Sequence, residues 1–287
     1  MYQIIFNPTA GKKKATKGLQ TVCELLKARG VAYQVHQTAE VRDAEKIARR
    51  LTKAGQNNLI VLGGDGTLHE VLNGIDDPSR CKLGLIPLGT GNDFAEAMGL
   101  PMDTKQAATL ILDGEAKPVD YLQVGNRRCM NVAGLGMDVR VLELCQQGKL
   151  KGKLKYLMSL IKCLFSYKGC ALTVESEGKA QERNVLLSAV CNGTQFGGGI
   201  KVCPAASIDD GKVDVVTVDC IGGAFKLMSA LLVLLRGKIL QYPKTTHFLC
   251  EKVRFVPKKP CTVQLDGELY ENLEMEISVG RGLRIYR

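Results

Sequence analysis

The chain has 287 residues, enough for two domains with sizeable cores, and a hydrophobic share of 45% excludes an intrinsically disordered protein. Lysine and arginine (39) outnumber aspartate and glutamate (29), which gives a net charge of +10. Because no aromatic-rich basic segment of the nucleic-acid-binding kind accompanies this excess, we expect no nucleic-acid partner, and an anionic small molecule or an anionic membrane surface fits the charge better.

The cysteines and the apolar segments indicate the compartment. The eleven cysteines are scattered without a Cys-x-x-Cys pair, and no secretory signal is seen, so we expect reduced thiols, no disulfides and no zinc. The longest apolar run, Leu227 to Leu235 with its flanks, is much shorter than the roughly 20 residues that a membrane-spanning helix requires. We therefore expect a cytoplasmic protein that is at most peripherally associated with membranes.

The first segments alternate strands and helices. Residues 2–6 are predicted as a strand that ends in the turn residues 7–11, and an amphipathic helix follows and stops at Gly30. Residues 31–37 are predicted as a second strand, and Thr38 can cap the amphipathic helix after it.

The third unit, residues 59–70, is a buried apolar strand followed by a glycine-rich turn and a helix start: Leu-Ile-Val-Leu-Gly-Gly-Asp-Gly-Thr-Leu-His-Glu. Glycines let the backbone approach a ligand, and the N–H groups of a helix start bind anions such as phosphate. Asp65 would lie at the rim of this phosphate site, where a carboxylate is useful chiefly with a divalent cation between it and the phosphates. The alternative is a tight turn in which Asp65 caps the helix.

A fourth strand, residues 82–88, ends in a second glycine turn that also carries an acid, Pro-Leu-Gly-Thr-Gly-Asn-Asp-Phe over residues 87–94. Four strands separated by helices predict a parallel sheet. Because the loops at the carboxyl ends of parallel strands converge, we expect one shared site. The polar residues of these loops are Asn7, Thr38, Asp65, Thr90, Asn92 and Asp93.

From about Lys117 the pattern changes to closely spaced strands, which predicts an antiparallel, sandwich-like second domain. The strands are expected at residues 121–124, 129–132, 171–175, 185–191, 213–218, 248–256, 262–265 and 273–279, and two helices at 150–167 and 224–240. We assign residues 1–121 and 122–287 to the two domains and allow for the last residues to pack back on the first. Asp120, at the junction, could face the shared site from the second side.

Two polar turns in the second half are candidate sites. Residues 207–212 contain two acids and could hold a hard cation through one carboxylate and main-chain carbonyl groups, or form an ordinary Asp-Gly turn between strands. Glu268 follows the Asp266–Gly267 pair just beyond a strand end, which by itself is a hairpin signal.

Together these motifs resemble those of the bacterial diacylglycerol and lipid kinase family, which is related to sphingosine kinases and more distantly to NAD kinases and phosphofructokinases. The resemblance covers essentially the whole chain, with matching motifs at residues 7–11, 63–67, 87–95, 209–211 and 266–268. It implies a three-layer α/β domain with a parallel sheet that binds ATP, a β-rich C-terminal domain for a lipid substrate, and catalysis between the two.

The resemblance also implies roles for individual residues. The residues matching nucleotide-contacting positions are Asn7, Thr38, Gly63, Gly64, Asp65, Gly66, Thr67, Leu68, His69, Thr90 and Asn92. Asp65, Asp93 and Asp120 would hold Mg²⁺ with its waters. Glu268 would accept the hydroxyl proton, a role that related eukaryotic kinases give to the acid of the glycine motif, here Asp65. A structural magnesium would be held by Asp210 with main-chain oxygens of Ser207 and Lys212.

The implied reaction is transfer of the γ-phosphate of ATP to a lipid hydroxyl, with diacylglycerol as the favoured acceptor and phosphatidic acid as its product. The alternatives are a kinase for another lipid, such as a sphingoid base or phosphatidylglycerol, an NAD kinase, or a catalytically silent lipid-binding protein on the same fold. The sequence leaves the oligomeric state open, with a homodimer as one candidate.

A membrane surface is the expected place of the lipid substrate. Between Lys149 and Lys168 the chain is basic, lacks acids and carries apolar residues at helical spacing, as in a helix that lies on an anionic leaflet. The alternative is that this apolar stripe packs on the sheet of the second domain.

Overall fold

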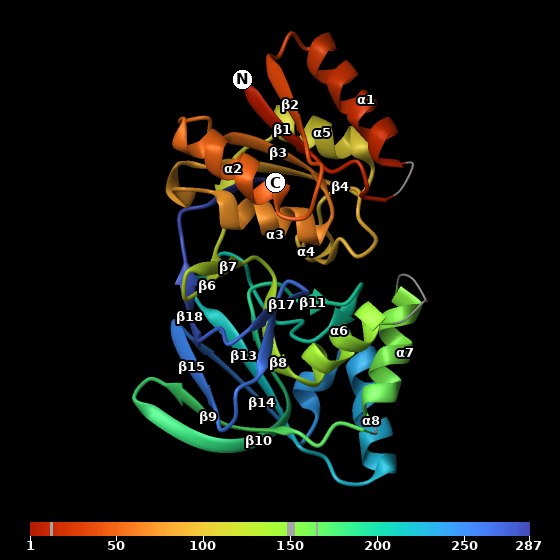
Figure 1. Cartoon of the computed structure of the whole chain (residues 1–287), viewed down its shortest axis with the longest axis vertical. Helices are drawn as coiled ribbons and strands as arrows, with labels where there is room; N and C mark the ends of the chain where they lie inside the picture. Colours follow the sequence, from red (N-terminus) through yellow and green to blue (C-terminus); the bar gives the residue numbers. More distant parts are fainter. Residues whose placement is uncertain (12–13, 148–152, 165) are drawn as a thin grey trace. The chain divides into compact units, whose positions relative to one another are not determined.

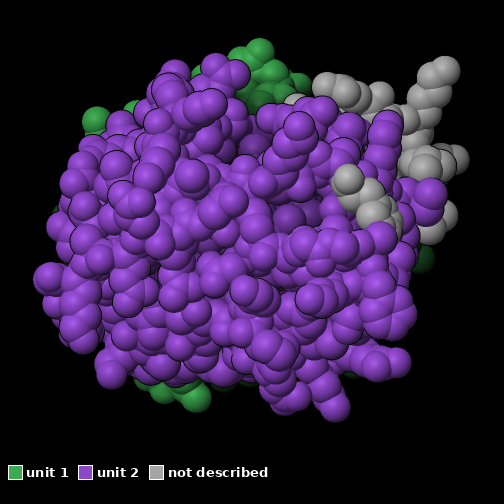
Figure 2. All heavy atoms as spheres, turned by 90° about the horizontal axis from the view of Figure 1, so that it is seen from below, with its two compact units in different colours: residues 1–120, 281–287 green, residues 121–280 purple. Residues whose placement is uncertain are grey.

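The computed structural model describes residues 1–11, 14–147, 153–164 and 166–287 (Figure 1). The chain divides into two compact units, residues 1–120 with 281–287 and residues 121–280 (Figure 2). In the described part of the chain, no helix is long and apolar enough to cross a membrane.

The first unit is built on a sheet with the strand order β2-β1-β3-β4-β19-β5. All its neighbouring strands pair in parallel except β5 and β19, which are antiparallel. The strands are β1 (Tyr2–Phe6), β2 (Tyr33–Gln37), β3 (Asn58–Gly63), β4 (Lys82–Pro87), β5 (Ala116–Pro118) and β19 (Arg284–Tyr286). The order reverses between β1 and β3, and ligands of open α/β sheets bind outside the carboxyl ends of strands at such a point.

Helices cover both faces of this sheet, because strands that are apolar on both sides must be buried on both sides. Helices α1 (Lys14–Ala28) and α5 (Thr104–Asp113) pack on one face, and α2 (Asp43–Lys53) and α3 (Asp65–Gly74) on the other (Figure 1). One shared core cluster joins alternate strand residues to the first helix pair: Ile4, Phe6, Ile60, Leu62, Ile86, Val22, Leu26, Ala107, Ala108 and Ile111. Short helices α4 (Asp93–Ala97) and η1 (Pro78–Arg80) complete the unit.

The second unit is an antiparallel β structure, since all neighbouring strands among its described residues pair antiparallel. The main path runs β17-β16-β8-β10-β9-β15-β18-β6-β7, and β13 pairs with both β10 and β14. The strands are β6 (Tyr121–Val124), β7 (Arg127–Cys129), β8 (Val132–Gly136), β9 (Cys170–Ser176), β10 (Lys179–Cys191), β13 (Val213–Asp219), β14 (Thr245–Cys250), β15 (Lys252–Pro257), β16 (Thr262–Leu265), β17 (Glu268–Glu271) and β18 (Met275–Gly280).

Smaller elements lie against this sheet. They are the hairpin of β11 (Gln195–Phe196) and β12 (Ile200–Lys201), and the helices α6 (Met137–Gln147), α7 (Lys153–Leu164), α8 (Ala224–Leu235) and η2 (Ile239–Gln241). Among the described residues, one core is made largely by the strands, another includes Leu234 of α8 and Ile239 of η2, and a third cluster joins α6, α7 and α8. The predicted fold class, a parallel α/β domain followed by an antiparallel β-rich domain, is confirmed.

Several predicted elements differ from the structure. The strand expected at residues 129–132 is wrong, because β7 ends at Cys129, β8 begins at Val132, and the carboxylate of Asp266 binds the backbone N–H groups of Met130 and Asn131 between them. The strand expected at 248–256 is two strands, since the chain turns at Glu251. Of the helix expected at 150–167, residues 153–164 form α7, and residues 150–152 and 165 lie outside the described part.

Candidate functional site

The loops after β1, β3 and β4 meet at the carboxyl edge of the first sheet, as the sequence predicts. Asn7 joins the first two loops, because its Nδ2 donates to Thr67 Oγ1 at 3.1 Å. Its Oδ1 accepts hydrogen bonds from the main-chain N–H and the hydroxyl of Thr9, so the turn after β1 holds the side chain in place. Thr38 lies beside them, since its N–H donates to Phe6 O at 2.9 Å.

The two glycine turns touch each other through their backbones. A Cβ built on Gly64 would lie 2.8 Å from Gly89 Cα, and one built on Gly63 would lie 2.5 Å from the side chain of Thr67. Helix α3 begins directly after Gly64, which has an extended conformation and gives no side-chain cap. Helix α3 therefore begins beside glycines that no larger residue could replace without a shift, and the N–H groups at a helix start suit a phosphate.

The N-cap position of α3 is taken by Gly64 and not by Asp65. Asp65 is the first residue of α3, and its Oδ1 accepts from Phe94 N at 3.3 Å, at the start of α4. In the second turn, Asn92 is left-handed with a φ of 54°, and its side-chain amide accepts from Gly89 N and donates to Gly89 O. Asp65 and Asn92 thus hold the second glycine turn in place.

The carboxylates of Asp65 and Asp93 flank Gly91. A Cβ on Gly91 would lie 2.9 Å from Asp65 Oδ2 and 3.5 Å from Asp93 Oδ2. Both carboxylates lie beside Gly91, and oxygen ligands of this kind suit Mg²⁺. The residues present at this edge of the sheet therefore fit a magnesium ion.

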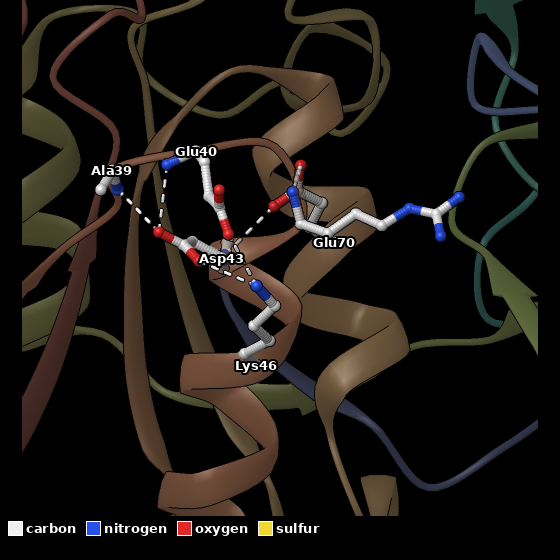
Figure 3. A network of polar contacts seen from close by, with 7 residues as sticks. Ala39, Glu40, Asp43, Lys46 and Glu70 are labelled. Carbon is white, nitrogen blue, oxygen red and sulfur yellow. Dashed lines mark hydrogen bonds and ion pairs between the residues drawn. The ribbon is translucent and has the colours of Figure 1, made fainter.

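The loop after β2 is held by carboxylates that the sequence analysis did not single out (Figure 3). Glu70 of α3 accepts the N–H groups of Arg42 and Ala44 at 3.0 and 3.1 Å. Asp43 accepts the N–H groups of Ala39 and Glu40, and these bonds lower its pKa. The prediction that Thr38 caps this helix is wrong, because α2 begins only at Asp43 and the N–H groups at its start bind Glu70.

The other predicted residues of the first unit occupy different environments. The side chains of Leu68 and His69 are buried in α3, with 1% and 3% exposed. Thr90 is exposed in the second glycine turn. Asp120 is buried at the last position before the chain enters the second unit, next to Val119, whose N–H donates to Leu283 O.

Glu268 is exposed at the start of β17, directly after a tight hairpin turn. Asp266 and Gly267 both have left-handed φ angles, 52° and 89°, as a two-residue turn between paired strands requires. Asp266 anchors this turn by accepting from Met130 N and Asn131 N, both at 2.8 Å.

A buried polar pair supports the same turn from beneath. Gln264 Oε1 accepts from Gly267 N at 2.9 Å, and Gln264 Nε2 donates to Asp138 Oδ2 at 3.2 Å. Asp138 is buried at the start of α6, and burial raises its pKa to about 7. The sequence analysis assigned no role to either residue, because their contact joins segments 126 positions apart.

The second predicted cation site is an exposed turn. Ser207 donates its hydroxyl to Asp209 Oδ1 at 2.9 Å, and Asp210 Oδ1 accepts from Lys212 N at 3.0 Å. Gly211 is left-handed, with a φ of 71°. These contacts are those of an ordinary Asp-Gly turn, while the oxygen donors also suit a hard cation.

Two protein families match the two parts of this chain. Residues 1–124 match the family described as Diacylglycerol kinase catalytic domain, and residues 131–283 match the YegS C-terminal NAD kinase beta sandwich-like domain. A diacylglycerol kinase of Bacillus subtilis is 32% identical over 273 residues, 93% of this chain and 89% of the relative. A Xanthomonas euvesicatoria protein named "Probable lipid kinase YegS-like" is 32% identical over 278 residues, with coverage of 93% and 89%.

A solved structure of a diacylglycerol kinase from Bacillus anthracis has the same fold, with a TM-score of 0.76 at 22% identity over 99% of this chain and 96% of that chain. The fold and the matches define a two-domain kinase. The chain belongs to the diacylglycerol kinase catalytic domain family, which confirms the resemblance seen in the sequence motifs. Membership of a kinase family implies ATP as a substrate.

The buried carboxyl of Asp138 should make stability depend on pH. Its pKa is raised from 3.8 to about 7 in the folded chain, so it favours the folded state while protonated and this contribution is lost as pH rises toward 7. Relative to Asp138→Asn, the wild-type free energy of unfolding should fall by about 2–3 kcal/mol between pH 5 and pH 8. Urea unfolding at both pH values measures this, with the exposed Asp76→Asn as a matched control. A constant difference between wild type and Asp138→Asn would show that the carboxyl is ionised throughout.

Proposed function

We propose that this chain transfers the γ-phosphate of ATP to a lipid hydroxyl, with diacylglycerol as the acceptor and phosphatidic acid as the product. The observation that carries the proposal is the pair of carboxylates, Asp65 and Asp93, which flank Gly91 beside the start of α3. The name of the Bacillus subtilis relative supports the acceptor. The name of the Xanthomonas relative keeps another lipid as the second candidate.

The first unit would bind and orient the nucleotide. The phosphates would lie along residues 63–67, where the N–H groups at the start of α3 favour negative charge. Asp65, Asp93 and Asp120 would hold Mg²⁺, which when bound neutralises charge on the phosphoryl group being transferred. Since phosphoryl transfer needs little covalent help from the protein, positioning by the two glycine turns would supply much of the rate.

The second unit would supply the proton acceptor and the structural magnesium. Glu268 is exposed at the end of a hairpin whose turn is anchored through Asp266 and Gln264, and such anchoring suits a base that must be held in one place. Asp210, with main-chain oxygens of Ser207 and Lys212, would hold the second magnesium ion in its exposed turn.

We also propose that helix α8 docks on the membrane that holds the lipid. Its exposed large apolar residues are Phe225 (88% exposed), Met228, Leu232 and Leu235, which recur at helical spacing on one side. Ala230, Leu231 and Leu234 on the opposite side are buried. The helix carries Lys226 and no acid, so its charge complements an anionic bilayer into which the apolar stripe would dip.

The basic segment 149–168 is the other candidate for this surface. Lys149 and Lys151 lie outside the described residues, as do the side chains of Lys153 and Lys155. The described part of α7 buries Leu160, Cys163 and Leu164 in a cluster with α6 and α8, which supports packing as the role of its apolar stripe.

Asp65→Asn should lower turnover of diacylglycerol at least a hundredfold while leaving the fold intact, because it removes charge from the magnesium site and keeps an oxygen for Phe94 N. Steady-state assays with ATP and detergent-dispersed diacylglycerol measure this. Asp113→Asn, an exposed carboxylate paired with Arg29, is the matched control and should keep full activity. Residual turnover within about tenfold of wild type corresponds to a loss of only ~1.4 kcal/mol of transition-state stabilisation. It would show that Asp65 supports the turn and does not hold the magnesium ion.

Glu268→Gln should lower turnover by roughly 10²–10⁴-fold while ATP still binds, as expected for loss of a general base. Parallel calorimetric titration with ATP and Mg²⁺ separates binding from chemistry. If Glu268→Gln turns over normally and Asp65→Asn does not, Asp65 is the proton acceptor. Mass spectrometry of a total lipid extract, with Glu268→Gln as the inactive reference, identifies the accepted lipid.

The pair Phe225→Glu and Leu232→Glu should weaken sedimentation with phosphatidylglycerol vesicles at least tenfold, because two apolar contacts become charges repelled by the anionic surface. The variant should keep its thermal midpoint and its activity on detergent-dispersed lipid, since both residues are exposed. Leu249→Glu, an exposed apolar position on β14, is the matched control. Unchanged vesicle binding in the double variant would exclude α8 as the docking surface.

A further inference from the structure

Three side chains of types that ligate metals, none of which was given a role above, meet on one face of the second sheet. They are Cys203, after β12, Asp214 on β13 and His247 on β14, and their donor atoms all lie within 4.8 Å of one another. The pairing of β13 with β14 sets Asp214 opposite Leu249 and Val216 opposite His247, so the two residues are diagonal neighbours. The hydrogen bond of Cys203 N to Thr194 O holds the cysteine over them.

The group is buried and polar in an otherwise apolar place. Cys203 and Asp214 are buried, whereas the His247 side chain is 23% exposed and leaves a route from solvent. Asp214 Oδ1 lies 2.6 Å from His247 Nε2, but Asp214 Oδ2 has no hydrogen-bond partner among the described residues. A buried carboxylate oxygen without a partner costs free energy that a bound cation would recover.

The geometry differs from that of a nucleophile activated by a histidine. In such a relay the acid and the nucleophile bind opposite nitrogens of the imidazole ring. Here both groups approach the same nitrogen, His247 Nε2. Asp214 Oδ1 lies 2.6 Å from it and Cys203 Sγ lies 3.8 Å from it. Donors around a tetrahedral Zn²⁺ ion are about 3.3–3.6 Å apart, given Zn–N and Zn–O near 2.0–2.1 Å and Zn–S near 2.3 Å. Small side-chain shifts would therefore bring all three donors onto one ion.

We propose that Cys203, Asp214 and His247 form a site for a divalent transition metal, with Zn²⁺ as the fitting ion and water as the fourth ligand. Thiolate and imidazole ligands favour Zn²⁺, whereas Mg²⁺ and Ca²⁺ prefer oxygen ligands alone. On binding, the Cys203 thiol loses its proton to solvent, and the charges of the thiolate, the carboxylate and the metal sum to zero. A neutral cluster is the form that a buried site tolerates best.

Cys191 lies beside this site without joining it. It pairs with Asp214 across β10 and β13. The hydrogen bond to Cys203 and burial raise its pKa well above the usual range. Cys191 is placed to donate its S–H to the Cys203 sulfur. Side chains around metal sites commonly form such hydrogen bonds to the ligands of the metal.

Cobalt binding to the full chain tests the proposal, because thiolate–Co²⁺ charge transfer absorbs in the near ultraviolet. The reduced, EDTA-treated protein is titrated with Co²⁺ alone, and one equivalent should produce this band, which Zn²⁺ then abolishes by displacement. Cys203→Ala should remove the band, and Asp214→Asn and His247→Gln should weaken Co²⁺ binding at least tenfold. Cys250→Ala removes another buried thiol, in the other core of the sheet, and should keep the band.

Two results would overturn the proposal. One is the absence of a thiolate band in the wild type at saturating Co²⁺; the other is a band of equal intensity and affinity in Cys203→Ala. Thermal unfolding provides a second measurement that does not depend on the cysteine variant. Zn²⁺ should raise the midpoint of the wild type and not that of Asp214→Asn, and an equal rise in both would also contradict the site.

Discussion

The close approach of Gly64 and Gly89 is the contact on which the candidate site depends. With a hypothetical Cβ at Gly64 only 2.8 Å from Gly89 Cα, no other residue fits without moving one turn away from the other. This contact sets the separation of β3's turn from β4's turn, and so the positions of Asp65 and Asp93 on either side of Gly91. The carboxylates of Asp65 and Asp93 can converge because the glycines around them have no side chains. The site therefore requires its glycines as much as its acids.

Features encoded by neighbouring residues could be predicted from the sequence, as could the meeting of loops that follows from a parallel sheet, whereas most individual contacts between distant segments could not. The strands before both glycine turns and the fold class follow from local periodicity and glycine placement. Strand β19 was not predicted, because its partners β4 and β5 lie far away in the chain. The group of Cys203, Asp214 and His247 has no local motif either, and the expectation of no zinc rested on the lack of such a motif.

Acids in this chain illustrate why residue type alone does not identify a catalytic group. Glu70 accepts two backbone N–H groups from a distant segment and Asp266 accepts three, and each thereby fixes a loop. In sequence they resemble their neighbours Asp65 and Glu268, which are candidates for chemistry. Main-chain donors occupy both carboxylate oxygens of Glu70 and both of Asp266, and this property is visible only in three dimensions.

The position of β19 has a consequence for how the protein is made. This strand lies between β4 and β5. Arg284, whose Nε donates to Ala116 O on β5, nevertheless leaves the ribosome 168 residues after Ala116. The first sheet therefore exposes an unpaired edge at β4 throughout translation of the second unit, whose strands pair among themselves. The usual order, in which the N-terminal domain is completed first, is reversed. While the second unit is being translated, the unpaired edge at β4 can pair with strands of other chains.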